Sequence, residues 1–129
     1  MAPDKLEQAY KSTRGITDIF IYGESTKSCL IAVIHSEEPD LKKIASEVGV
    51  NGSMEEMCEN DGIKKWFVAA LEDMRKEQGL KGFERIVKVH LTPESFEKQD
   101  LLTTTFKTKR NVAQDHFKEQ LDKMYEGLD

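Results

Sequence analysis

The residues best suited to chemistry lie in one short stretch, LLTTTFKTKR at 101–110. It contains three cations, Lys107, Lys109 and Arg110, together with four threonines and no acid. Alternation along an extended segment would place the two lysines on the same side. A lysine ammonium on its flexible stem offers a mobile charge to a phosphate. The same residue types also fit a loop that only meets water, so they permit a phosphate ligand without requiring one.

Other arrangements that support chemistry do not occur in the sequence. The histidines and cysteines do not combine at the spacing of metal ligands: they are His35, His90, His116, Cys29 and Cys58. We therefore expect no metal site. No nucleophile–histidine–acid motif, phosphate-binding glycine loop or dinucleotide-binding motif is present. The lack of a C-x-x-C pair indicates a reducing compartment and no disulfide framework.

Length and charge limit the class of protein. A chain of 129 residues fits about one domain with a modest core. Its net charge of −5 argues against general binding to nucleic acids or membrane surfaces, which normally needs a basic field. No apolar run approaches the roughly 20 residues of a membrane span, and no signal peptide is visible. We therefore expect one soluble intracellular domain with no transmembrane segment and no nucleic-acid partner.

Hydrophobic periodicity predicts an alternation of helices and strands. A first helix should begin near Pro3 and its pattern should end at Gly15. Strands are expected at 16–22, 27–35 and 84–91, the first two joined by a hairpin turn at 23–26. Helices are expected at 39–48, around 54–57, at 63–78 and at 111–125, with a further helical turn starting at Thr92 and Pro93.

The pattern also predicts which sides of these elements are buried. Both faces of the 27–35 strand are apolar, so it should lie inside the sheet and be covered on both sides. Ser53 and Glu56 match a capping box at a helix start. The apolar stripes expected in the core are Ile63, Trp66, Phe67, Ala70, Leu71 and Met74, and in the last helix Val112, Phe117, Leu121 and Met124. We predict an α+β fold, with a small, mainly antiparallel sheet of about three strands and helices packed on its faces.

Four segments resemble one known family in the right order: APDKLEQAY (2–10), GVNGSMEEMCEN (49–60), LKGFERIVKVHLTPESF (80–96) and LLTTTFKTKR (101–110). Together they resemble the C-terminal domain of long-chain fatty acyl-CoA synthetases, which belong to the AMP-forming superfamily of adenylating enzymes. The first segment is similar to the end of a family motif, G-E-Y-V-A-P-x-K-L-E-x-x-Y. The last is similar to L-L-T-P-T-F-K-x-K-R. The resemblance covers nearly the whole chain and implies the fold of that domain.

The resemblance implies a catalytic role for Lys107, which falls on the lysine of the family's final motif. Such an enzyme joins a fatty acid to ATP with Mg²⁺, giving acyl-adenylate and pyrophosphate, and CoA then displaces AMP. A placed ammonium would stabilise the charge on the α-phosphate. The domain would act as a lid that rotates between the half-reactions and excludes water. Thr105, Lys109 and Arg110 would contact nucleotide or CoA phosphates, although Arg110 could equally pair with an acid near the following helix.

The chain departs from the family pattern in two ways. Thr104 stands where long-chain members usually have proline, so the loop should be less stiff before binding. The hinge aspartate, the first half of the opening motif and the large domain for ATP and acyl chain do not occur in the chain. We therefore interpret residues 1–129 as a single lid domain that lacks synthetase activity and binds no cofactor alone. Its partners would be the missing N-terminal domain and, through the parent enzyme, fatty acid, ATP, Mg²⁺ and CoA.

Two further expectations depend on the resemblance. The protein should be cytoplasmic, with the parent enzyme peripheral to intracellular membranes. The alternative to a lid is a stand-alone regulatory or protein-interaction module derived from the same fold. A change of Lys107→Ala would leave partner binding by such a module largely intact, whereas in a lid it would impair adenylation.

Overall fold

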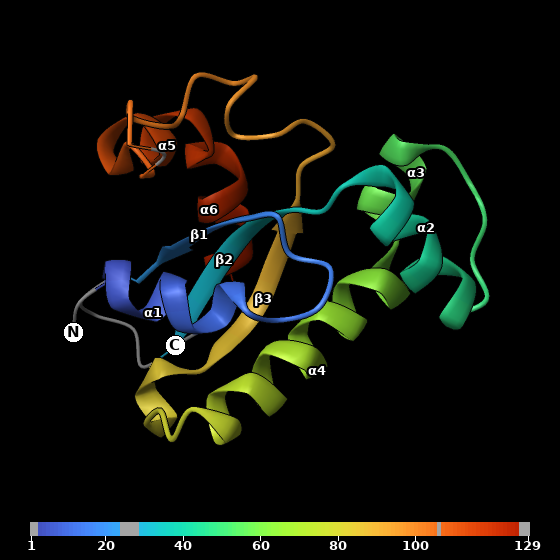
Figure 1. Cartoon of the computed structure of the whole chain (residues 1–129), viewed down its shortest axis with the longest axis horizontal. Helices are drawn as coiled ribbons and strands as arrows, with labels where there is room; N and C mark the ends of the chain where they lie inside the picture. Colours follow the sequence, from blue (N-terminus) through green and yellow to red (C-terminus); the bar gives the residue numbers. More distant parts are fainter. Residues whose placement is uncertain (1–2, 24–28, 106, 127–129) are drawn as a thin grey trace.

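A single mixed sheet forms the centre of the computed structural model, which describes residues 3–23, 29–105 and 107–126 (Figure 1). Within these ranges the sheet has three strands in the order β1-β2-β3. Their bounds are β1 Asp18–Tyr22, β2 Leu30–His35 and β3 Ile86–Leu91. The predicted α+β class and the three strands are confirmed.

The two strand pairs run in different directions. β1 pairs antiparallel with β2, and Phe20 lies opposite Val33. β2 pairs parallel with β3, and Ala32 lies opposite Val89. The second pair is parallel because the chain between β2 and β3 returns through helices rather than through a hairpin. Of the hairpin turn expected at 23–26, residues 24–26 lie outside the described residues.

Helices cover both faces of the sheet. The described residues contain α1 Pro3–Lys11, α2 Glu38–Glu47, α3 Met54–Glu59, α4 Asp61–Glu77, α5 Arg110–His116 and α6 Lys118–Tyr125, with a short 3₁₀ turn at Gly82–Glu84. Figure 1 shows α1 and α4 on one side of the sheet and α5 and α6 on the other. Each of these helices is too short or too polar to cross a bilayer.

The central strand separates two hydrophobic cores. All six residues of β2 are buried, as the sequence predicts for an interior strand. Leu30, Ala32 and Ile34 face the first core, which α1, α2, α3 and α4 cover. Ile31 and Val33 face the second core, which α5, α6 and the segment 96–102 cover. Alternating side chains of one strand thus join the two layers of helices.

The first core contains the predicted stripe of the long helix except Ala70. Ile63, Phe67 and Leu71 are fully buried in α4, and the Trp66 ring packs edge-on against Phe67 with centroids 5.1 Å apart. The predicted capping box is also present. The Ser53 hydroxyl accepts from the Glu56 amide at 3.2 Å, while the Glu56 carboxylate accepts from the Ser53 amide at 3.0 Å. These contacts stabilise the start of α3.

The end of the chain differs from the single helix expected at 111–125. The helix breaks at Phe117, which lies between α5 and α6. Phe117, Leu121 and Met124 are buried as predicted, but Val112 is 46% exposed, so its expected burial is wrong. Ala113 is fully buried instead, because it lies four residues before Phe117 and so shares its side of the helix.

Candidate functional site: the lysine loop

The residues expected to do chemistry lie in a small hairpin-like loop, residues 102–108, which we call the lysine loop. Its ends pair at an isolated bridge between Leu102 and Thr108. The Thr103 amide donates to the Lys107 carbonyl at 2.7 Å, and the Lys107 amide donates to the Thr103 hydroxyl at 3.1 Å. The Thr103 and Thr105 hydroxyls lie 3.1 Å apart. Thr103 and Thr105 therefore stabilise the loop through hydrogen bonds between its own residues. Phe106 lies outside the described residues.

Lys107 carries its charge at the exposed part of this loop. Its side chain is exposed, and within the described residues no ion pair joins it to an acid. Lys107, Thr105 and Thr108 line one side of a hollow of about 290 Å³. The opposite side comes from α1 and the start of β1, through Glu7, Gln8, Lys11, Asp18 and Ile19. The ammonium is thus free to meet a ligand beside a surface of mixed charge.

Lys109 and Thr105 lie on either side of Lys107 but are placed differently. The Lys109 amide donates to the Leu101 carbonyl at 2.7 Å, which closes the stem of the loop. Its ammonium lies 3.2 Å from a carboxylate oxygen of Asp100, which is 90% exposed. An exposed pair of this kind is weak. Thr105 is exposed at the end of the loop, so both side chains remain accessible.

Arg110 is held within the fold. Its guanidinium donates to the Glu7 carboxylate at 2.9 Å and to the Ile21 carbonyl at 2.6 Å, and it lies over the Phe20 ring at 4.9 Å from the centroid. An acid does therefore pair with Arg110, but it comes from α1 rather than from the helix that follows. Glu7 carries no local signal for this role, since the two residues are 103 positions apart. The phosphate contacts expected of Thr105, Lys109 and Arg110 stay predictions.

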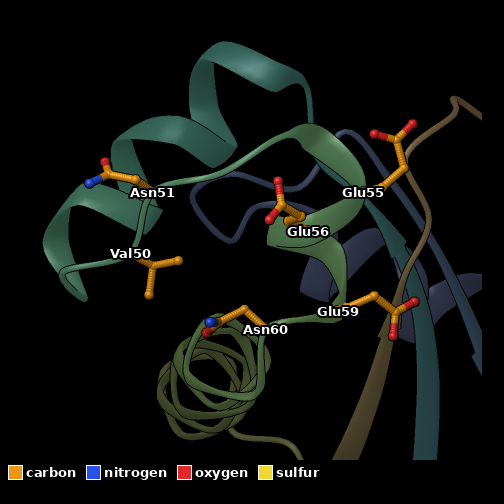
Figure 2. A pocket seen from close by; sticks show the side chains of 6 residues that line it. All are labelled: Val50, Asn51, Glu55, Glu56, Glu59 and Asn60. Atoms are coloured by element: carbon orange, nitrogen blue, oxygen red, sulfur yellow. The ribbon is translucent and has the colours of Figure 1, made fainter.

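A second hollow, of about 500 Å³, lies where α2, α3 and α4 meet (Figure 2). It shares no lining residue with the hollow beside Lys107. It is lined by Val50, Asn51, Glu55, Glu56, Glu59 and Asn60. Two of these polar side chains already stabilise helix starts. Glu56 belongs to the capping box, and Asn60 accepts from the Ile63 amide at 3.0 Å. Local backbone groups therefore account for part of this polarity.

Three further titratable side chains, Cys58, His90 and His35, are buried or partly buried. No group of three metal-ligating side chains occurs within the described ranges. Burial raises the pKa of the Cys58 thiol to about 11, so it stays protonated and weakly nucleophilic at neutral pH. Burial also lowers the pKa of His90, with Lys64 adding to the effect. The buried His35 ring nitrogen lies 3.0 Å from the Thr92 carbonyl.

Comparison with known proteins identifies sequence relatives that match the whole chain. No protein-family model matches. Long-chain-fatty-acid–CoA ligase 5 of Rattus norvegicus is 38% identical over 130 residues, which is 100% of this chain. Long chain acyl-CoA synthetase 4 of Arabidopsis thaliana is 34% identical over 99% of the chain, and long-chain-fatty-acid–CoA ligase 1 of Homo sapiens is 38% identical over 99%. The chain spans about a fifth of the length of these relatives: 19%, 19% and 18%.

Solved structures share the fold at lower identity. The adenylation domain of a carboxylate reductase from Mycobacterium chelonae matches 97% of this chain with a TM-score of 0.80 and 25% identity. The adenylation domain of carboxylic acid reductase from Segniliparus rugosus, in complex with AMP, matches 97% with a TM-score of 0.79 and 23% identity. The chain covers 18% of each of these structures. By sequence over its whole length, the chain is related to a segment, about a fifth, of long-chain fatty acid–CoA ligases, and it shares its fold with part of the adenylation domain of a carboxylate reductase.

Proposed function

We propose that the chain is the C-terminal lid domain of an ATP-dependent long-chain fatty acid–CoA ligase, in which Lys107 is the adenylation lysine. The observation that carries this proposal is the placement of Lys107. Its side chain is exposed on a loop braced by its own backbone and threonines, beside a hollow, while Arg110 is engaged in the fold. The relatives named as long-chain-fatty-acid–CoA ligases support the choice of reaction.

In the proposed first half-reaction, a fatty acid carboxylate attacks the α-phosphorus of ATP. A new oxygen–phosphorus bond forms, the bond to the bridging oxygen breaks, and pyrophosphate leaves. The Lys107 ammonium stabilises the negative charge that shifts onto the α-phosphate oxygens and the bridging oxygen. In this proposal ATP, Mg²⁺ and the acyl chain are held mainly by the rest of the enzyme.

In the second half-reaction, the CoA thiol attacks the acyl carbonyl and AMP leaves. The lysine loop is not needed for this step, so the domain rotates as a lid and presents another face to the active centre. Thr105 and Lys109, which flank Lys107, contact phosphates of nucleotide or CoA. Arg110 remains bound to Glu7 and Ile21 and serves this proposal by supporting the loop that carries Lys107. Such a ligase is cytoplasmic and peripheral to intracellular membranes.

The first test compares the isolated chain with the whole enzyme from the same source. With fatty acid, ATP, Mg²⁺ and CoA, the 129-residue chain should form no acyl-CoA, because most ATP and acyl contacts are missing. The whole enzyme should be active, and removal of the segment that matches this chain should abolish adenylation. Appreciable acyl-CoA formation by the pure chain would contradict the proposal.

The alternative is a stand-alone regulatory or protein-interaction module. The two buried cores favour it, because they indicate a domain with packing of its own. The size of the natural polypeptide separates the two candidates. An antibody raised against this chain should detect a protein several times larger than 14.7 kDa in lysate from its source if the lid proposal is right. A band near 14.7 kDa would support the module instead.

A further inference from the structure

Two segments from opposite ends of the chain meet at one buried carboxylate. A single oxygen of Glu7, in α1, accepts from the Arg110 guanidinium at 2.9 Å and from the Ile21 amide at 2.7 Å. Arg110, the first residue of α5, also donates to the Ile21 carbonyl at 2.6 Å. Glu7 therefore binds the Ile21 amide, and Arg110 binds the Ile21 carbonyl. The three residues tie α1, β1 and α5 together.

This contact is partly shielded from water, mainly on the side of Glu7. The Glu7 side chain is 11% exposed and the Arg110 side chain 31%. Charge-assisted hydrogen bonds are strong in partly buried surroundings, and removing either residue deprives the other of this contact. The Phe20 ring beneath the guanidinium further restricts its orientation, since a cation is attracted to an aromatic face. The position of Arg110 relative to α1 and β1 is thus narrowly defined.

Arg110 lies two residues after the lysine loop, and its fixed position constrains Lys107. One end of the loop begins after Leu101, which is fully buried in the second core. The other end reaches Arg110 after the stem bond from the Lys109 amide to the Leu101 carbonyl. The loop therefore has an apolar anchor on one side and a polar anchor on the other. Gln8 and Lys11, from the helix that carries Glu7, line the hollow beside Lys107.

We propose that Glu7 and Arg110 form a clasp that holds the lysine loop against α1 and β1 and so sets the position of Lys107. Both are positioning residues: they act through the loop rather than on the substrate. This inference rests on the proposed function for its catalytic consequence, but the clasp itself can be tested without activity. In the whole ligase the clasp makes α1 and the lysine loop move together, so rotation of the lid carries Lys107 into and out of place.

The clasp is tested first in the 129-residue chain by amide hydrogen exchange followed by NMR. In Arg110→Met and Glu7→Gln, exchange at Thr103, Lys107 and Lys109 should accelerate about tenfold or more, while the amides of α4 keep their protection. Arg110→Lys keeps one charged donor and should give an intermediate change in exchange. This milder substitution keeps the test valid if Arg110→Met fails to fold. The control is Glu47→Gln, which removes the carboxylate that pairs with Arg14 on the exposed surface. Unchanged exchange in the loop, or equal acceleration throughout the chain, would overturn the clasp.

The catalytic consequence is tested in the whole enzyme. Arg110→Met should lower kcat for adenylation about 10- to 100-fold with little change in KM for ATP, because a displaced catalytic group loses rate rather than binding. Arg110→Lys should restore part of the rate, and Glu47→Gln should leave it unchanged. If Lys107→Ala has no effect on adenylation, the proposed function is refuted. The hydrogen-exchange data then still show whether the clasp between Glu7 and Arg110 exists. If Lys107→Ala abolishes adenylation but Arg110→Met alters neither rate nor exchange, the clasp alone is refuted.

Discussion

The face of the sheet under α1–α4 and the face under α5 and α6 are stabilised in different ways. The first core is large and apolar, and local contacts such as the capping box and the Asn60 cap complete its helices. The second core is smaller, and several hydrogen bonds between residues far apart in sequence support it, whereas the first face combines its local caps with a long-range bond from Tyr10. The Tyr125 hydroxyl donates to the Cys29 carbonyl at 3.1 Å, and the Phe96 amide donates to Asp18 at 3.1 Å.

This difference bears on the proposed function, because the lysine loop starts from the second core and lies beside α1 and β1. Leu101 anchors one end of the loop in the second core, and Arg110 anchors the other end to α1 and β1. The first face supplies a scaffold that does not depend on the loop. Under the lid proposal, a smaller core suits a segment that presents a charge in one half-reaction and withdraws it in the other. Changes on the two faces should therefore have different local effects.

The largest effects are expected from removing one phenylalanine on each face. Phe67→Ala and Phe117→Ala should each lower the free energy of unfolding by about 3–5 kcal/mol, measured by urea denaturation, because each ring is almost fully buried. Hydrogen exchange should distinguish them. Phe67→Ala should accelerate exchange in both layers, whereas Phe117→Ala should act mainly on α5 and α6. The same exchange pattern in both variants would mean that the two faces open as one unit.

A smaller effect is expected at Tyr10, which joins α1 to the turn before β3. Its hydroxyl donates to the Glu84 carbonyl at 2.7 Å. Tyr10→Phe removes this bond within the first face and should cost about 1–2 kcal/mol at neutral pH, measured by urea denaturation. The lysine-loop amides should keep their protection, because Tyr10 does not contact the second core. Loss of loop protection in this variant would contradict the separation of the faces.

Tyr10 also predicts a pH dependence. Burial raises its pKa to about 12 from an ordinary value of 10.0. The folded state therefore binds this proton more tightly than the unfolded chain. The resulting stability is complete below pH 10 and falls as pH rises from 10.0 towards about 12. The stability difference between wild type and Tyr10→Phe should shrink over this window, and a constant difference would refute the assignment.

The smallest effect is expected at the capping box of α3. Ser53→Ala should cost about 1 kcal/mol, because the Glu56 amide loses its acceptor. Ser46→Ala is the matched control: this exposed serine lies inside α2, where alanine is at least as favourable. Thermal unfolding measures both. An equal change in the two variants would show that the cap is not the cause.

The same cap predicts a response to acid. The Ser53 amide and hydroxyl hold the pKa of Glu56 below its usual value. A lowered folded pKa gives stability that is present above the ordinary pKa and is lost as pH falls through the lowered one. Glu56→Gln should therefore lose less stability than wild type on acidification, as followed by urea denaturation at stepped pH. An identical acid response in the two proteins would contradict this role.

Local sequence patterns predicted much of the structure on the first face of the sheet. The apolar stripe of α4, the burial of β2 on both sides and the Ser53–Glu56 box all depend on spacings of a few residues, which sequence displays directly. The parallel direction of β3 was harder to predict, because it depends on how the intervening helices return the chain. The break at Phe117, which exposes Val112, depends on packing against the sheet rather than on periodicity.

The candidate site was predictable only in part. Lys107 stands out in sequence because basic and threonine residues gather around it. The sequence did not predict the hydrogen bonds of Thr103 or the clasp between Glu7 and Arg110. Their partners are set by the folded loop and by contacts across 103 positions, and no local pattern marks them. The support of the loop thus became apparent only in three dimensions.

The most direct test of the account measures the two half-reactions separately in the whole ligase carrying Lys107→Ala. Pyrophosphate exchange reports adenylation, and thioester formation from a supplied acyl-adenylate reports the second step. We predict that adenylation falls about 10²–10³-fold while thioester formation stays within a few-fold of wild type. Lys98→Ala, an exposed lysine outside the loop, should change neither rate. Unchanged adenylation, or an equal fall in both half-reactions, would contradict the assignment of Lys107 as the adenylation lysine.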